Sequence, residues 1–207
     1  MSSACPQLYY ITDRHTCPCP LLDNIGRAIR AGVDFVQIRE KDLPVREMLS
    51  LARTAGKMRT GSRTRILVND RLDVAFAAEL DGIHLAQSSI PANQISNKLS
   101  RPDFLITVST HSWKEVRAVQ DCANFVTFGP VFFTPSKAKY GPPVGLEALK
   151  QVCDSSKIPV FALGGIDETN YAQCLMNGAS GIAAIRLFQN PNTAIEEIVR
   201  KIKGPTN

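Results

Sequence analysis

Short apolar runs rich in β-branched residues recur along the chain and alternate with longer segments whose apolar residues are spaced three and four apart. The short runs are mostly continuous, as expected of strands that are covered on both faces. They predict strands at residues 8–12, 35–38, 65–69, 82–86, 105–109, 125–129, 159–164 and 181–187. The longer segments predict helices at residues 23–31, 44–58, 71–80, 91–99, 112–120, 146–153, 168–176 and 191–202.

Eight alternating strand and helix units predict one closed (β/α)8 TIM barrel, a single domain that covers residues 1–207. An open, doubly wound α/β sheet is the alternative. Eight units suit the closed barrel better, and no GxGxxG motif follows the first strand. Chemistry in such a barrel occurs at the carboxyl ends of the strands, so the residues that follow each short run are the candidates for a site.

Composition and charge narrow the function classes. The apolar runs are too short to span a bilayer and the first residues lack the features of a signal peptide, so a cytoplasmic protein is expected. The net charge of +5 comes from scattered basic residues, a pattern that does not indicate nucleic-acid binding but suits a small anionic substrate. The six cysteines match no common zinc spacing and are expected to be free thiols, although Cys17 and Cys19 leave an adventitious metal or a redox contact as an alternative.

The second strand is followed by two cations. Alternation in an extended segment places Gln37, Arg39 and Lys41 on one face, so an amide and two positive charges converge at the barrel mouth. The alternative is an ion-pair lattice around the rim, formed with Glu40 and Asp42.

The third and fifth strands also end in polar residues. Asp70 follows Asn69, and it either caps the helix that begins near Leu72 or binds a hard cation such as Mg²⁺, which often takes one or two protein carboxylates beside phosphates. Ser109 and His111 follow the fifth strand.

His111 is followed by Ser112, a predicted helix N-cap, and Glu115 completes a capping box. A lone histidine is more often structural than catalytic, but the mouth of a barrel favours a functional role for His111.

Two further strand ends carry phosphate-binding features. The loop after the sixth strand is the longest connection, and it holds Thr134, Ser136 and Lys137, which favours a binding loop or lid over a solvated surface loop. Paired glycines, Gly164 and Gly165, follow the seventh strand and would let a phosphate approach the backbone. Residues Ile185 and Arg186, at the end of the eighth strand, would complete the usual phosphate site of a barrel.

The phrases QIREKDL, VNDRLDVA, DGIHLAQ, VSTHS, FGPVFFTPSK, ALGGI and GIAAI occur in this order along nearly the whole chain. Together they resemble the thiamine-phosphate synthase family, which includes a thiazole tautomerase branch. The resemblance implies a (β/α)8 barrel in thiamine biosynthesis, usually a homodimer or another small oligomer. A synthase of this family joins hydroxymethylpyrimidine diphosphate to a thiazole phosphate and releases Mg²⁺-bound diphosphate.

The resemblance also implies roles for individual residues. Diphosphate would be held by Gln37, Arg39, Lys41, Asn69 and Lys137. Asp70 would bind Mg²⁺, and Ser109, His111 and Lys137 are the candidate catalytic residues. The thiazole phosphate would be received by Thr134, Ser136, Gly164, Gly165, Ile185 and Arg186.

The chain departs from the synthase pattern at two positions. Ser89 stands where synthases usually have an acidic second Mg²⁺ ligand, and Arg186 stands where they tend to have a small residue. A metal site formed by Asp70 and Ser89 would therefore contain one carboxylate, with water and diphosphate as the remaining ligands.

These departures leave a second activity open, that of a thiazole tautomerase, which shifts a proton within a thiazole carboxylate phosphate. His111 aligns with the acid/base histidine of that branch. We favour the synthase because the cationic phosphate ligands are retained, which indicates that negative charge is still bound. A non-catalytic regulator that binds a thiamine precursor is a third interpretation, since a fold does not determine activity.

Overall fold

Eight parallel strands pair in chain order and close into a barrel, because β8 also pairs with β1. The computed structural model describes residues 5–99, 101–135 and 141–204. The strands are β1 (Gln7–Ile11), β2 (Phe35–Ile38), β3 (Arg65–Asn69), β4 (Gly82–Leu85), β5 (Leu105–Thr110), β6 (Phe125–Phe128), β7 (Val160–Leu163) and β8 (Gly181–Ala184). The prediction of a (β/α)8 barrel is confirmed, and an open sheet is excluded.

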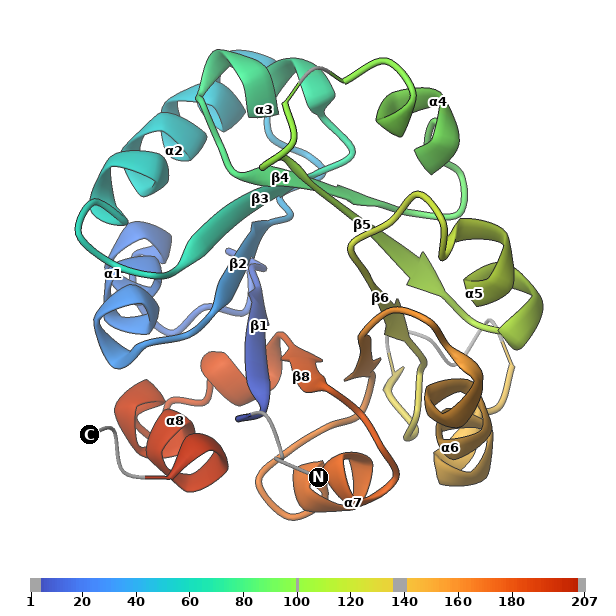
Figure 1. The fold of residues 1–207 in the computed structure, drawn as a ribbon. Coiled ribbons are helices and arrows are strands. Elements are labelled where there is room, and N and C mark those ends of the chain that lie inside the picture. The colour runs from blue at the N-terminus through green and yellow to red at the C-terminus, as the bar shows by residue number, and fades with distance from the viewer. Residues whose placement is uncertain (1–4, 100, 136–140, 205–207) are drawn as a thin grey trace.

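The helices form an outer ring around the strands (Figure 1). They are α1 (Leu21–Ala31), α2 (Val45–Met58), α3 (Leu72–Ala77), α4 (Ala92–Ser96), α5 (Trp113–Val119), α6 (Gly145–Ser155), α7 (Tyr171–Met176) and α8 (Ile195–Lys203). One buried cluster fills the space between this ring and the strands, and a second, smaller cluster lies inside the barrel.

The last strand is shorter than the predicted 181–187. It ends at Ala184, and Ile185 already has helical backbone angles, with φ −96° and ψ −67°. A short 3₁₀ helix, η2 (Arg186–Phe188), follows, and its Leu187 and Phe188 are buried. Leu187 and Phe188, predicted to lie in a strand, are therefore buried from a helical turn. In so short an apolar run, the spacing of residues cannot distinguish a strand from a helix.

Two helices begin later than predicted because side chains compete for the backbone donors near their starts. Asp167 Oδ1 accepts a hydrogen bond from Thr169 N at 2.8 Å, and α7 begins only at Tyr171. Asn190 Oδ1 accepts from Asn192 N at 2.9 Å, and α8 begins only at Ile195. Such local side-chain turns offer the backbone an alternative to the helix.

The lower barrel interior is filled by aromatic rings. Tyr9, Phe35, Phe125 and Phe161 come from alternating strand positions that point inward, and all are buried. The Phe125 ring centre lies 4.5 Å from that of Phe161 and 4.9 Å from that of Phe35. Pairs at these separations contribute beyond the area they bury, so the rings form a rigid floor beneath the polar residues of the mouth.

The amino-terminal end of the barrel is tied together by side chains that precede three even-numbered strands. Each oxygen accepts a hydrogen bond of 2.7 Å from a backbone N–H of the preceding strand: Asp34 from Leu8, Asp81 from Ile66, and Asn124 from Ile106. Asp81 also pairs with Arg59 and Arg65, at 3.0 and 3.6 Å. These contacts serve stability, the usual role of this end of a barrel.

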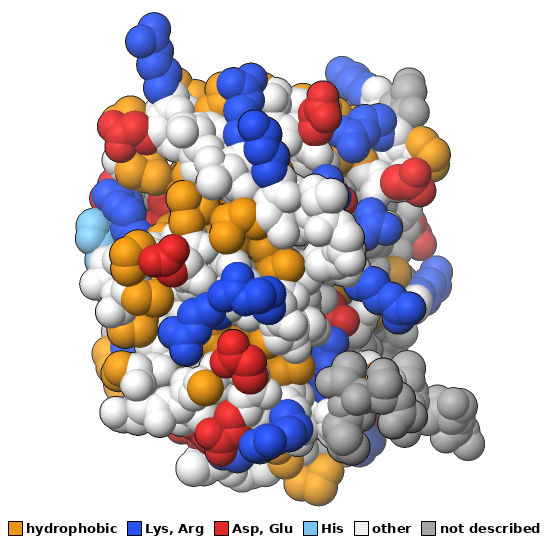
Figure 2. All heavy atoms as spheres, turned by 90° about the vertical axis from the view of Figure 1, so that its left-hand side faces the viewer, with side chains coloured by type: hydrophobic (Ala, Val, Ile, Leu, Met, Phe, Trp, Pro, Cys, Tyr) orange, Lys and Arg blue, Asp and Glu red, His pale blue; other side chains and the backbone are white. Residues whose placement is uncertain are grey.

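No helix in residues 5–99, 101–135 and 141–204 is both long and apolar enough to cross a membrane. On the face shown in Figure 2, Lys and Arg side chains are dispersed among acidic and apolar ones. This arrangement agrees with the scattered basic residues of the sequence. All six cysteines are free thiols.

Asp81→Ala is expected to lower the free energy of unfolding by about 2–3 kcal/mol, because the buried Ile66 N–H loses its acceptor and two arginines lose their carboxylate. Chemical denaturation measures this change. Asp154→Ala is the matched control: it removes an exposed pair with Lys150 and should change stability by no more than about 0.5 kcal/mol. Equal losses in the two variants would contradict the structural role of Asp81.

Candidate active site

Polar side chains form a layer above the aromatic floor, at the carboxyl ends of the strands. Gln37 is 1% exposed and donates from Nε2 to Asn69 Oδ1 at 3.1 Å, so the structure brings these two predicted residues together. Gln37 Oε1 is buried and has no hydrogen-bond partner among the residues that the structure describes. A buried amide oxygen without a donor is uncommon, which makes it a candidate contact for a ligand.

The predicted rim lattice exists, but its cation is Arg14. The Arg14 guanidinium contacts both Asp42 oxygens, at 2.5 and 2.7 Å, and reaches Glu40 Oε2 at 3.4 Å. Glu40 is 2% exposed and also accepts from Thr12 Oγ1 at 2.5 Å. Within the described part of the chain Arg39 has no ion-pair partner, so its charge is available at the mouth.

The backbone N–H of Arg39 donates to Thr12 Oγ1 at 3.0 Å, which anchors the residue to the end of β1. Lys41 follows as an exposed residue at the start of the connection to α2. Both predicted cations therefore lie just beyond β2, and Arg39 is held there by its backbone.

Asp70 does not cap α3, contrary to one of its two predicted roles. The N-cap residue is Arg71, without a side-chain cap, and Asp70 instead has a left-handed backbone with φ 66°. Its N–H donates to His84 O at 2.9 Å, and its exposed carboxylate has no hydrogen bond or ion pair among the described residues.

Ser89 closes its own turn. Its Oγ accepts from Ala86 N at 2.7 Å, and its N–H donates to Ala86 O at 3.0 Å. Within the described ranges, no group of three or more His, Cys, Asp or Glu side chains could hold a metal ion. Asp70 and Ser89 as metal ligands therefore stay predictions.

His84 is a site residue that the sequence reasoning missed. It lies on β4 inside the barrel, is 3% exposed, and approaches Ser109 Oγ with Nε2 at 2.8 Å and Thr107 Oγ1 with Nδ1 at 2.8 Å. Burial lowers its pKa to about 3, and the positive charge of Arg39 acts in the same direction. The signal in the sequence was a polar residue within an apolar strand, at a position whose neighbours Ile83 and Leu85 face the helices.

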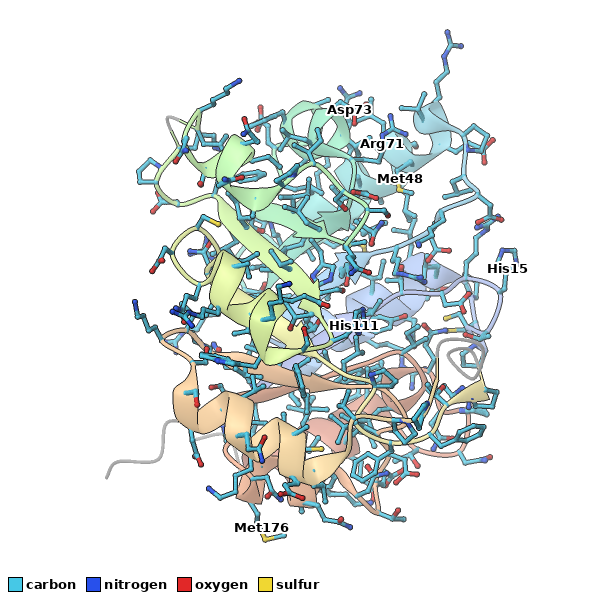
Figure 3. All side chains as sticks on the ribbon, turned by 90° about the vertical axis from the view of Figure 1, so that its right-hand side faces the viewer. His15, Met48, Arg71, Asp73, His111 and Met176 are labelled. Carbon is cyan, nitrogen blue, oxygen red and sulfur yellow. The ribbon has the colours of Figure 1, made fainter. Side chains whose placement is uncertain are left out.

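His111 is half-buried after β5 and faces the sixth strand. Its Nδ1 is hydrogen-bonded to the carbonyl oxygen of Gly129, and its backbone N–H donates to Glu115 Oε2 at 2.8 Å. Ser112 is the N-cap of α5 and accepts from Glu115 N at 3.3 Å, as predicted. Figure 3 labels His111 near the middle of the view and His15 at its right-hand edge.

Gly164 and Gly165 have a structural role in addition to the predicted one, which stays a prediction. Both have positive φ, 97° and 65°, and a Cβ on Gly164 would lie 2.5 Å from Pro130 Cβ. A Cβ on Gly165 would lie 2.5 Å from Phe133 O. The glycines therefore admit the loop after β6, rather than only a phosphate.

Backbone donors are nevertheless present at this corner. The N–H groups of Gly165 and Arg186 have no acceptor among the described residues. The Arg186 side chain is exposed, and Thr134 is half-buried in the loop after β6. Ser136 and Lys137 lie outside the described residues, so their predicted roles stay predictions.

The buried neutral His84 predicts a pH effect on stability. The unfolded chain takes up a proton on this imidazole near 6.5, the folded chain only near 3, so the stabilisation is present above pH 6.5 and is lost as the pH falls toward 3. Between pH 3 and pH 6.5, the free energy of unfolding of the wild type should rise with pH more steeply than that of His84→Gln. The difference in slope should be up to about 1.4 kcal/mol per pH unit. Denaturation at several pH values measures it, and equal slopes would contradict a buried neutral ring.

Comparisons with known proteins agree with this geometry. A family model described as thiamine monophosphate synthase matches residues 8–188. A protein of Geobacter sulfurreducens named putative thiamine-phosphate synthase is 46% identical over 180 residues, which cover 86% of this chain and 84% of that protein. A thiamine-phosphate synthase of Roseiflexus sp. is 36% identical over 86% of this chain and 76% of its own.

A solved structure, the thiamine phosphate pyrophosphorylase from Pyrococcus furiosus, superposes with a TM-score of 0.83 at 30% identity. The superposition covers 95% of this chain and 96% of that one. The matches extend across the barrel and include the ends of all eight strands, where the polar residues gather. The chain therefore belongs to the thiamine monophosphate synthase family.

Proposed function

We propose that this protein is a thiamine-phosphate synthase, which couples hydroxymethylpyrimidine diphosphate to a thiazole phosphate and releases diphosphate. The observation that carries the proposal is the state of Arg39. The neighbouring carboxylates Glu40 and Asp42 are both taken by Arg14, and Arg39 is left at the mouth without an ion-pair partner among the described residues. An arginine with free donors, anchored through its backbone, suits an anionic ligand.

Diphosphate binding follows from the charges and amides around Arg39. Arg39 and Lys41 supply positive charge, and Asn69 is oriented by the amide of Gln37 at 3.1 Å. Lys137, outside the described residues, would add a third cation. Fixed donors of this kind stabilise the charge that accumulates on the leaving diphosphate without having to reorganise.

The side chains at the mouth can provide Mg²⁺ with a carboxylate, but most of its ligands would have to come from water and diphosphate. Mg²⁺ bound beside phosphates keeps several waters and often takes one or two protein carboxylates. Asp70 offers one carboxylate that is unpaired within residues 5–99, 101–135 and 141–204, and Ser89 Oγ already accepts from Ala86 N at 2.7 Å. When bound, Mg²⁺ would neutralise charge on the diphosphate oxygens.

The reaction breaks one bond and forms one. The bond between the pyrimidine methylene carbon and the bridging diphosphate oxygen breaks, and both electrons leave with diphosphate. The thiazole ring nitrogen then donates its lone pair to the methylene carbon. The role of the protein is to hold the two substrates in line and to keep water from the carbon.

The thiazole phosphate is proposed to bind between β7 and β8. The N–H groups of Gly165 and Arg186, which have no acceptor in the described ranges, are suitable donors, as in other barrel phosphate sites. Thr134 and Ser136, on the loop after β6, would contact the same phosphate, and Gly164 and Ile185 would shape its backbone cradle. Arg186 would place a charge near this site where related synthases tend to have a small residue.

The tautomerase alternative is not favoured. The residue that would support a tautomerase is His111. Its Nδ1 is hydrogen-bonded to Gly129 O, which leaves Nε2 for acid/base chemistry. The relatives and the solved structure described above carry synthase or pyrophosphorylase names. A tautomerase binds no diphosphate. In a tautomerase, Arg39, which has no ion-pair partner among the described residues, would therefore have no anionic ligand either.

A non-catalytic regulator is favoured less than either enzyme. The mouth retains the cations Arg39 and Lys41 and the polar layer below them, which a protein that only binds a precursor would not need. The family resemblance further suggests a cytoplasmic homodimer or small homo-oligomer that acts on small phosphorylated substrates.

The direct test supplies purified protein with pyrimidine diphosphate, thiazole phosphate and Mg²⁺, and measures diphosphate release together with thiamine phosphate. Release should require both substrates and should stop when a chelator is added. Chelator-resistant isomerisation of a thiazole carboxylate phosphate, without diphosphate release at any Mg²⁺ concentration, would replace the synthase with the tautomerase.

Arg39→Ala should lower kcat/KM for the pyrimidine diphosphate by about a hundredfold or more, the size expected for the loss of a preorganised charged donor. Lys41→Ala should act in the same direction. Arg46→Ala, an exposed arginine on α2, is the matched control and should retain normal turnover. Near-normal turnover in Arg39→Ala would return this residue to a structural role.

Ser89→Asp should lower the Mg²⁺ concentration required for half-maximal turnover, because a second carboxylate strengthens a hard-cation site. Asp70→Asn should abolish Mg²⁺-dependent turnover. Calorimetric titration of Mg²⁺ in the presence of inorganic diphosphate gives a readout that does not depend on activity. Unchanged Mg²⁺ affinity in both variants would remove Asp70 and position 89 from the metal site.

A further inference from the structure

The imidazole of His84 is hydrogen-bonded inside the barrel to hydroxyl groups on both of its ring nitrogens. Its two ring nitrogens each approach a hydroxyl oxygen at 2.8 Å, Thr107 Oγ1 at Nδ1 and Ser109 Oγ at Nε2. The ring is 3% exposed, and no carboxylate is among its hydrogen-bond partners in the described residues. Its proton positions are therefore set by the hydroxyls alone.

The neighbouring strand determines which nitrogen carries the proton. Thr107 Oγ1 donates its single proton to the carbonyl oxygen of Ile83 at 3.2 Å, so towards His84 it can only accept. With the Thr107 hydroxyl oriented in this way, Nδ1 is the nitrogen that carries the proton. A lone pair on Nδ1 would otherwise face an oxygen lone pair at 2.8 Å, and the longer contact with Tyr9 OH, at 3.3 Å, could not offset that repulsion.

The state of Ser109 follows from this tautomer. A neutral imidazole that is protonated on Nδ1 has an acceptor on Nε2, so Ser109 donates its O–H downward into the barrel. Thr127 Oγ1 also donates a hydrogen bond to Ser109 Oγ, at 3.4 Å. Ser109 is half-buried near the carboxyl end of β5, and these two hydrogen bonds leave one of its lone pairs for a ligand.

We propose that His84 is a positioning residue that holds the Ser109 hydroxyl as an acceptor facing the substrate. The inference rests on the proposed synthase function. As diphosphate leaves, the pyrimidine methylene carbon gains positive charge, and an oxygen lone pair stabilises that charge, whereas an O–H directed at it would not. Burial lowers the pKa of His84, and the positive charge of Arg39 acts in the same direction, so the ring is neutral.

Two substitutions separate orientation from packing. His84→Asn retains an amide donor for Thr107 but has no acceptor that reaches Ser109, whereas His84→Gln can place its amide oxygen near the position of Nε2. His84→Asn should lower kcat by about ten- to a hundredfold, with the KM of both substrates nearly unchanged, and His84→Gln should recover most of the loss. Equal losses in the two variants would overturn the proposal.

A double-mutant cycle supplies the decisive comparison. In the Ser109→Ala background the hydroxyl is absent, so His84→Asn should lower kcat no further. Losses that multiply would show that His84 acts through the packing of the barrel. Thermal unfolding of each variant checks that the fold is retained.

NMR of the labelled imidazole nitrogens of the wild-type protein tests the tautomer without turnover. Protonated Nδ1 and unprotonated Nε2 support the proposal, and the reverse assignment overturns it. A wild-type protein that releases no diphosphate would refute the synthase function, while the tautomer measurement would still decide the orientation of Ser109.

Discussion

Closure of eight parallel strands is the constraint on which the rest of this structure depends. Because successive side chains of a strand point to opposite faces, closure divides every strand into residues that face the helices and residues that share the barrel interior. The interior is narrow, so each inward side chain contacts its neighbours from adjacent strands. Aromatic rings occupy the lower part, and polar groups from β2 to β6 occupy the part below the mouth.

This stratification links packing to chemistry. The floor formed by Tyr9, Phe35, Phe125 and Phe161 excludes water from below. Polar groups directly above it have few alternative partners, so they orient one another, as Gln37 orients Asn69 and Thr107 orients His84. Hydrogen bonds in such surroundings are stronger than in water, and an unpaired atom is correspondingly unfavourable. Gln37 Oε1 has no partner in the part of the chain that the structure describes, which favours a ligand at that position.

The mouth shows how neighbouring charges acquire different roles. Arg14 and Arg39 both lie beyond strand ends, and Glu40 and Asp42 are close to Arg39 in the chain. Arg14 binds both carboxylates and holds the pKa of Asp42 well below its usual range through these hydrogen bonds. That pairing stabilises the rim and leaves the charge of Arg39 for a ligand, so a structural ion pair and a candidate binding residue arise from adjacent positions.

Local patterns along the chain were sufficient to predict the fold, the approximate strand ends and the residue types at the mouth, because periodicity and turn residues are local properties. They could not determine that Glu40 pairs with Arg14, that Asp70 adopts a left-handed backbone, or that Gly164 admits Pro130. Nor did they identify His84, whose importance comes from its contact with Ser109 on the neighbouring strand. These features depend on the register between strands that are distant in the chain. Only closure of the barrel sets that register, and it thereby decides which polar groups meet.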